Sequence, residues 1–183
     1  AAHSTERELW KDYLGSNRGE RGPGGGNREG ATTGELAASP VTLTEHLTLQ
    51  LELENLEDRK RRIGLALIGS LDDDGYLREP LASLAETMGR PAAEIEEVLA
   101  IVRHFDPPGV AARNLSECLA IQLEQMDAGE TTICITRDFL PEVARSAYAE
   151  IAKALSVSTA RVRHAVDLIR HLCPSPGSLF DNS

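Results

Sequence analysis

Apolar residues recur at helical spacing in two neighbouring stretches of the chain. Between residues 42 and 56 they stand at Leu43, Leu47 and Leu51, four positions apart on one helix face. Between residues 57 and 71 the apolar positions are Ile63, Leu67, Ile68 and Leu71. The pattern predicts two amphipathic helices joined by a short turn, which is an antiparallel helical hairpin.

Two capping boxes mark predicted helix starts. Thr42 and Glu45 stand three residues apart, and so do Asn114 and Glu117. In such a box the first side chain accepts from a first-turn amide, while the carboxylate reaches back to the backbone of the capping residue. The second box predicts a helix over residues 114–126. The β-branched stretch 131–136 that follows is either extended or a plain connector.

A proline-rich corner separates two of the predicted helices. Pro107 and Pro108 have a fixed φ and no amide donor, so the preceding helix is expected to end near Phe105. Gly109 permits the sharp reversal that follows. The corner carries no evident nucleophile or metal ligand, which indicates a structural role. Its motif residues are Phe105, Asp106, Pro107, Pro108, Gly109, Arg113, Asn114 and Glu117.

A helical pattern repeats without a gap after 67 residues. Residues 81–104 and 148–171 each predict a short helix, a turn and a longer helix, which is a helix-turn-helix. Identical pairs include Arg103 with Arg170 and His104 with His171. Both histidines stand at helix C-termini, where a partial positive charge suits the helix dipole, so capping of the helix end is the plain explanation.

The acidic turn before the first repeat resembles a metal site only superficially. It reads Asp72, Asp73, Asp74, Gly75 and Tyr76. A calcium loop with Gly75 at its sixth position would start at Ser70 and place Leu81 where the bidentate Glu belongs. We therefore expect a tight turn with Gly75 at positive φ, and no metal or other cofactor.

Composition and charge narrow the class of protein. The 183 residues are 41% hydrophobic but only 4% aromatic, which favours helices packed through aliphatic side chains. Residues 41–136 carry eight basic and eighteen acidic groups, a net of −10, whereas residues 137–183 have a net of +1. An acidic body disfavours non-specific nucleic-acid binding and suits a partner with a basic surface.

Residues 1–40 contrast with the rest of the chain. Residues 15–34 hold eight glycines and a proline with almost no apolar side chain, so a flexible, disordered linker is expected. Around Trp10 and Tyr13 a short helical piece is expected. The chain starts without a signal peptide and without Met, and it reads as a fragment of a larger protein.

Catalytic chemistry is not evident. No His-Glu-x-x-His, Gly-x-Ser-x-Gly or complete phosphate loop occurs, so we do not expect an enzyme. The three cysteines form no Cys-x-x-Cys pair and suit a reducing cytoplasm. No apolar run long enough for a membrane span is present.

One helix of the repeat has the chemistry to touch DNA. The second helix of a helix-turn-helix can read DNA with its N-terminal half. In the first unit that half carries Glu94, Glu96 and Glu97, which would repel phosphates. In the second unit it carries Arg161, Arg163 and His164, so residues 158–170 are a candidate promoter-DNA contact, with a solvated charged face as the alternative.

Two long motifs resemble those of the sigma-54 family of bacterial RNA polymerase sigma factors. They are Ile68-Gly-Ser-Leu-Asp-Asp-Asp-Gly-Tyr-Leu77 and Phe105-Asp-Pro-Pro-Gly-Val-Ala-Ala-Arg-Asn-Leu-Ser-Glu-Cys-Leu119. Thr44-Glu45-His46-Leu47 and Pro174-Ser-Pro-Gly177 add to the likeness, which covers about residues 41–180.

The resemblance implies a core-binding domain that docks on the β and β′ subunits of RNA polymerase in the bacterial cytoplasm. It implies that promoter DNA is read mainly by a C-terminal domain missing from this chain. It also implies that the ATP-dependent activator contacts mainly an N-terminal region, of which residues 8–14 are a candidate remnant.

We expect an all-α fold with two small helical subdomains after a disordered Gly-rich segment. The predicted divisions are a linker at residues 1–40, a helical bundle at 41–128 and a helix-turn-helix-like three-helix unit at 129–183. The predicted function is binding of core RNA polymerase, and the alternative is promoter contact through residues 158–170.

Overall fold

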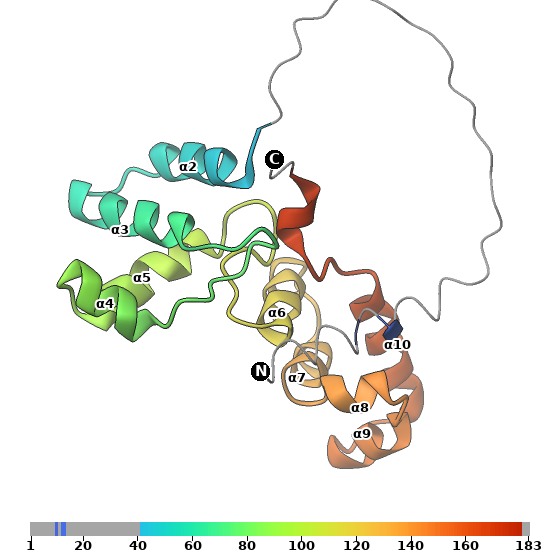
Figure 1. The fold of residues 1–183 in the computed structure, drawn as a ribbon. Helices are drawn as coiled ribbons and strands as arrows, with labels where there is room; N and C mark the ends of the chain where they lie inside the picture. The colour runs from blue at the N-terminus through green and yellow to red at the C-terminus, as the bar shows by residue number, and fades with distance from the viewer. Residues whose placement is uncertain (1–9, 11, 14–40, 181–183) are drawn as a thin grey trace, which may run out of the picture.

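The chain folds into short helices packed around two apolar clusters (Figure 1). The computed structural model describes Trp10, Asp12, Tyr13 and residues 41–180; the Gly-rich stretch 15–34 lies outside these residues. The described residues form no strand, only an isolated bridge between Leu71 and Leu77. The helices are α2 (Leu43–Leu53), α3 (Asp58–Gly69), α4 (Leu81–Met88), α5 (Ala92–Val102), α6 (Leu115–Gln125), α7 (Glu130–Asp138), α8 (Leu140–Ala144), α9 (Tyr148–Ala154), α10 (Thr159–Arg170) and the 3-10 helix η1 (Pro176–Leu179). The predicted all-α class is confirmed.

The first helical unit, α2 to α5, begins as the sequence predicts. The Thr42 hydroxyl accepts from the amide of Glu45 at 3.2 Å, and the Glu45 carboxylate accepts from the amide of Thr42 at 3.0 Å. Helices α2 and α3 then form the predicted hairpin, which packs on α5. The shared core includes Leu47, Leu51 and Leu67, each at most 1% exposed.

The second helical unit, α6 to α10, contains a segment for which the sequence-based prediction of secondary structure was wrong. Residues 131–136 are neither extended nor a connector but the middle of α7. Ile135 is fully buried in the second apolar cluster, and the buried Thr136 hydroxyl donates to the carbonyl of Thr132 at 2.9 Å. Tertiary burial and this internal hydrogen bond override the β propensity of threonine and isoleucine.

Trp10 and Tyr13 pack on the second unit, far along the sequence from it. Trp10 is 2% exposed within the second cluster, and the rings of Trp10 and Tyr13 lie 5.3 Å apart. The Tyr13 hydroxyl lies 3.0 Å from that of Tyr148 and accepts from the guanidinium of Arg170 at 2.9 Å. Burial and the hydrogen bond with Tyr148 raise the pKa of Tyr13 to about 12, so this phenol stays neutral at physiological pH.

Replacing Tyr13 with Ala should release Trp10 into water. The change removes the ring contact with Trp10 and the bonds to Tyr148 and Arg170, so the fluorescence of this single tryptophan should shift to longer wavelength. Tyr13→Phe keeps the ring and should give a smaller shift. Unchanged emission from Tyr13→Ala would contradict the packing described.

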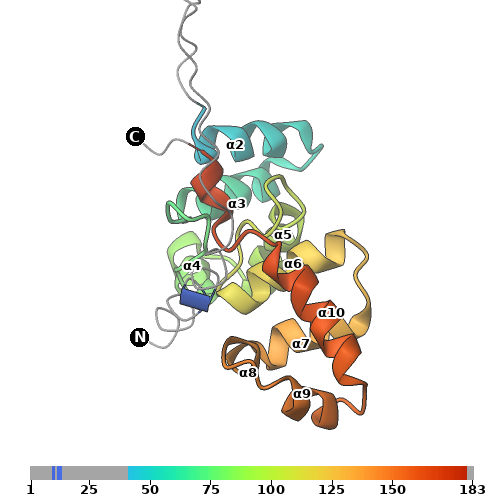
Figure 2. The ribbon, with the colours of Figure 1, turned by 90° about the vertical axis from the view of Figure 1, so that its right-hand side faces the viewer.

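Helix α6 of the second unit and the C-terminal segment contact the first unit. Leu115, Leu119 and Leu123 of α6 face the second cluster, while Cys118 and Ile121 pack beside Tyr76. Figures 1 and 2 show η1 returning from α10 to lie beside α2 and α3. Phe180 packs partly buried against the first cluster. The division at residues 128 and 129 stays a prediction.

Candidate functional site

The proline corner is anchored to α2. Helix α5 ends at Val102, earlier than the predicted end near Phe105, because turns occupy the intervening residues. Phe105 is only 5% exposed in the first cluster. The Gln50 side chain donates to the carbonyl of Asp106 at 2.6 Å and accepts from its amide at 2.8 Å. The Asp106–Pro107 peptide is cis.

Gly109 lies inside the corner in a conformation that favours glycine. Its φ is +90°, a region that costs other residues strain. A Cβ at this position would lie 2.7 Å from the sulfur of Cys118 and 2.8 Å from the side-chain nitrogen, Nε2, of Gln122. Pro107 and Gly109 are buried, whereas Pro108 is exposed.

The predicted capping box at α6 is half right. The Asn114 side chain accepts from the amide of Glu117 at 2.8 Å, as expected. The Glu117 carboxylate, however, accepts from the amide of Arg113 at 2.7 Å rather than from that of Asn114. The reason is that the Arg113 guanidinium also binds Glu117, at 3.0 Å, and draws the carboxylate one residue further back.

Glu117 is the centre of a small charge cluster. Its carboxylate lies 2.6 Å from Arg103 and 3.0 Å from Arg113. Burial raises the pKa of Glu117, but the Arg113 hydrogen bonds and the Arg103 charge outweigh burial and hold the pKa below its ordinary value. Glu117 is therefore ionised at neutral pH, and the cluster ties the end of α5 to the start of α6.

The acidic turn folds onto its own backbone. The Asp72 carboxylate accepts from the amides of Asp74 at 3.1 Å and Tyr76 at 2.8 Å, and it pairs with Arg78 at 2.7 Å. Gly75 has φ +88°, as the tight-turn interpretation predicts. Within residues 41–180, no three His, Cys, Asp or Glu side chains gather as a metal site would require.

The corner and the turn meet the C-terminal segment at one place, which we call the junction: residues 72–77, 109–112 and 174–177. The amide of Ala111 donates to the carbonyl of Gly75, and the amide of Leu77 donates to that of Ala112, both at 2.9 Å. Gly177 donates to the carbonyl of Asp74 at 2.9 Å. The Tyr76 hydroxyl donates to the carbonyl of Pro174 at 2.6 Å. The structure thus brings the acidic turn and the proline corner together, and the contacts between them are mainly backbone hydrogen bonds.

A polar groove opens beside the junction, between α5 and α6. Its volume is about 1120 Å³. Charged side chains of both signs line it, among them Arg103, Arg113, Glu117, Glu124 and Arg137. Glu117 pairs with the first two arginines and Glu124 with Arg137, so each of these five charges has an opposite charge beside it.

Two other surfaces stand apart from the junction. On α2, Leu49 is 58% exposed and Leu53 is 79% exposed, next to the exposed Glu52. On α10, the candidate DNA contacts Arg161, Arg163 and His164 are exposed. None of the described helices has the length and hydrophobicity needed to cross a bilayer.

Comparison with known proteins decides the family. The family model described as "Sigma-54 factor, core binding domain" matches residues 33–183, most of the chain. The chain belongs to the sigma-54 family. This confirms the resemblance inferred from the motifs at the turn and the corner, whose residues form the junction.

The sigma-54 relatives are longer than this chain. An RNA polymerase sigma-54 factor of Xanthomonas euvesicatoria is 44% identical over 157 residues, which cover 81% of this chain and 33% of that protein. RNA polymerase sigma-54 factor 1 of Bradyrhizobium diazoefficiens is 37% identical over 164 residues, 90% of this chain and 34% of that protein. The chain therefore spans about a third of the length of these sigma-54 factors.

Sequence reasoning missed three residues that fix the segments next to the junction of this sigma-54 chain. Gln50 and Gln122 each bind backbone groups more than 50 residues away: Gln122 donates to the Cys173 carbonyl at 2.7 Å and accepts from its amide at 2.9 Å. Neither leaves a local pattern. The third, Arg103, did carry a signal, because the repeat aligns it with Arg170 and both arginines make ion pairs.

Proposed function

We propose that this chain binds core RNA polymerase as the docking part of a sigma-54 factor. The match of residues 33–183 to the core binding domain carries the proposal. The chain acts without catalysis, in the bacterial cytoplasm, on the β and β′ subunits. In the whole factor, promoter DNA is read mainly by a C-terminal domain, and the ATP-dependent activator acts mainly on an N-terminal region.

The junction is proposed to hold the two units in place rather than to touch polymerase. The turn residues 72–76 and corner residues 105–109 donate and accept mostly within the chain. Arg113, Asn114 and Glu117 likewise bind one another. Such a framework presents the surfaces of the flanking helices in a fixed relation, which a docking module requires.

The exposed face of α2 is the surface we assign to polymerase. Leu49 and Leu53 stand one helical turn apart, so they form an apolar stripe. Glu52 and Glu54 border it, and residues 41–136 carry a net charge of −10. A central apolar contact with acidic neighbours fits a basic partner surface, in which charge steers association and apolar burial slows dissociation.

The direct test is co-elution of the purified chain with core polymerase in size-exclusion chromatography. We expect a complex at micromolar concentrations that weakens as salt increases, because charge steers the association. Elution of the two components apart at every salt concentration would overturn the proposal.

Replacing Leu49 and Leu53 together with Asp should weaken polymerase binding at least about tenfold, because it would place two charges in the apolar centre of the proposed contact, and a loss of about 1.4 kcal/mol is already tenfold. Stability should hardly change, because both side chains are exposed. The matched control is Met126→Asp, at an apolar residue that is 62% exposed beyond the end of α6. Equal weakening by the control would argue against the α2 face.

A further inference from the structure

The two helix-turn-helix units share a side-chain hydrogen bond as well as a sequence pattern. Helices α4 and α5 correspond to α9 and α10 at the repeat of 67 residues. The ring Nδ1 of His104 lies 2.7 Å from the carbonyl of Ala100, and that of His171 lies 2.6 Å from the carbonyl of Asp167, four residues earlier in both cases. Positions in α5 can therefore be compared one by one with positions in α10.

The comparison reveals a reversal of charge. Glu94, Glu96 and Glu97 of α5 correspond to Arg161, Arg163 and His164 of α10. In α5 the acidic positions are used internally: Glu94 pairs with Arg59 at 2.6 Å, and Glu97 pairs with Lys60 at 2.5 Å. Helix α3 thus engages the N-terminal half of α5.

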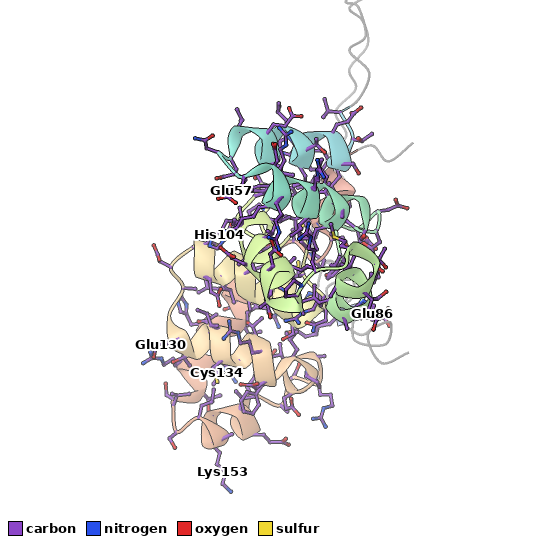
Figure 3. The ribbon with its side chains drawn as sticks, turned by 90° about the vertical axis from the view of Figure 1, so that its left-hand side faces the viewer. Glu57, Glu86, His104, Glu130, Cys134 and Lys153 are labelled. Carbon is purple, nitrogen blue, oxygen red and sulfur yellow. The ribbon has the colours of Figure 1, made fainter. Side chains whose placement is uncertain are left out.

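The basic positions of α10 have no such internal use. Arg161, Arg163 and His164 are exposed, and their side chains make no hydrogen bond or ion pair with any residue that the structure describes. Most other described arginines, such as Arg137 and Arg145, are paired. Lys153, at the tip of α9 and directed away from the first unit in Figure 3, is unpaired among these residues as well.

The basic side chains of α10 are arranged around the helix in a way that suits insertion into a groove of DNA. Val162 and Ile169 define its buried side. Arg161 and Arg163 are two positions apart, about 200° around the helix, so they project from opposite flanks of the exposed face. His164 lies between them on that face. The first turn of α10, capped by Ser158, adds the positive end of the helix dipole.

We propose that α10 contacts duplex DNA, with Arg161 and Arg163 on phosphates at the two sides of the major groove and His164 over the base edges. This is the docking of a helix-turn-helix, in which the N-terminal half of the second helix enters the groove. The single acid on the exposed side one turn later, Asp167, pairs with Arg170 at 3.4 Å. The acidic remainder of the chain confines the contact to this helix.

Fluorescence anisotropy of a labelled promoter duplex, titrated with the 183-residue chain at increasing salt, tests the proposal. Each lost phosphate contact lowers the slope of log K against log salt by about 1, so Arg161→Ala with Arg163→Ala should lower it by about 2 and weaken binding. The matched control is Arg62→Ala with Arg90→Ala, which removes the same charge from arginines that are also exposed and also unpaired among the described residues. The control should keep the slope.

Three outcomes would overturn the proposal. Equal slopes for the two double variants would make the contact a general charge effect, and absence of duplex binding at about 50 mM salt would exclude the contact. Loss of polymerase co-elution by the α10 variant, with duplex binding unchanged, would assign the face to an acidic protein surface. Failure of the unaltered chain to bind polymerase would sink the proposed function and leave the DNA result standing.

Discussion

Replacing Gly109 with Ala should destabilise the fold by about 3 kcal/mol or more. The positive φ of +90° costs an L residue about 1 to 2 kcal/mol. The new Cβ would also lie 2.9 Å from the carbonyl oxygen of Cys118, besides the close contacts with the Cys118 sulfur and Gln122, and overpacking of this kind costs about 1 to 3 kcal/mol. Urea unfolding followed by circular dichroism measures the loss.

Gly89→Ala is the control that separates strain from crowding. Gly89 also has a positive φ, +60°, but a Cβ there would meet nothing within 4 Å. It should cost only about 1 to 2 kcal/mol. Equal losses at Gly89 and Gly109 would mean that the contacts with Cys118 and Gln122 do not matter.

Replacing Gly177 with Ala should detach the C-terminal segment from the acidic turn. A Cβ at Gly177 would lie 2.2 Å from the carbonyl oxygen of Asp73 and 2.8 Å from the amide nitrogen of Gly75, and neither backbone group can move aside freely. We expect a loss of about 2 to 3 kcal/mol. Amide hydrogen exchange should rise in residues 72–77 and 174–180 together, because the junction opens as a unit.

Gly69→Ala is the matched control, since a Cβ at this last residue of α3 would meet nothing within 4 Å. It should leave stability unchanged or raise it slightly, because Ala favours the helix. Normal protection of residues 72–77 in Gly177→Ala would refute the role given to that glycine.

The helices could be predicted where the determinants are local. The Thr42 capping box, the spacing of Leu43, Leu47 and Leu51, and the repeat each act within a few residues. Helix α7 could not be predicted, because its helical conformation depends on the packing of Ile135 in the second cluster, against α6 and α10. The preference of its threonines for strands is only weak evidence about secondary structure.

The candidate site, too, could be predicted only where its determinants are local in the sequence. The corner and the turn were recognisable from proline, glycine and aspartate, whose backbone effects are local. Their meeting was not, because it depends on Gln50, on Gln122 and on the carbonyl of Pro174, and the Tyr76 hydroxyl reaches that carbonyl across 98 residues. The unpaired state of Arg161 and Arg163 likewise required the structure, since composition alone cannot say which charges find partners.

The contact between η1 and the acidic turn can form only late during synthesis of the chain. Gly177 leaves the ribosome about 100 residues after Asp74, which at roughly 5 to 20 residues per second is a delay of about 5 to 20 seconds. During that interval the Asp74 carbonyl lacks its bond from the amide of Gly177, and the Tyr76 hydroxyl lacks its bond to the carbonyl of Pro174. The nascent first unit must therefore hold its shape through its own core until the end of the chain arrives to complete it.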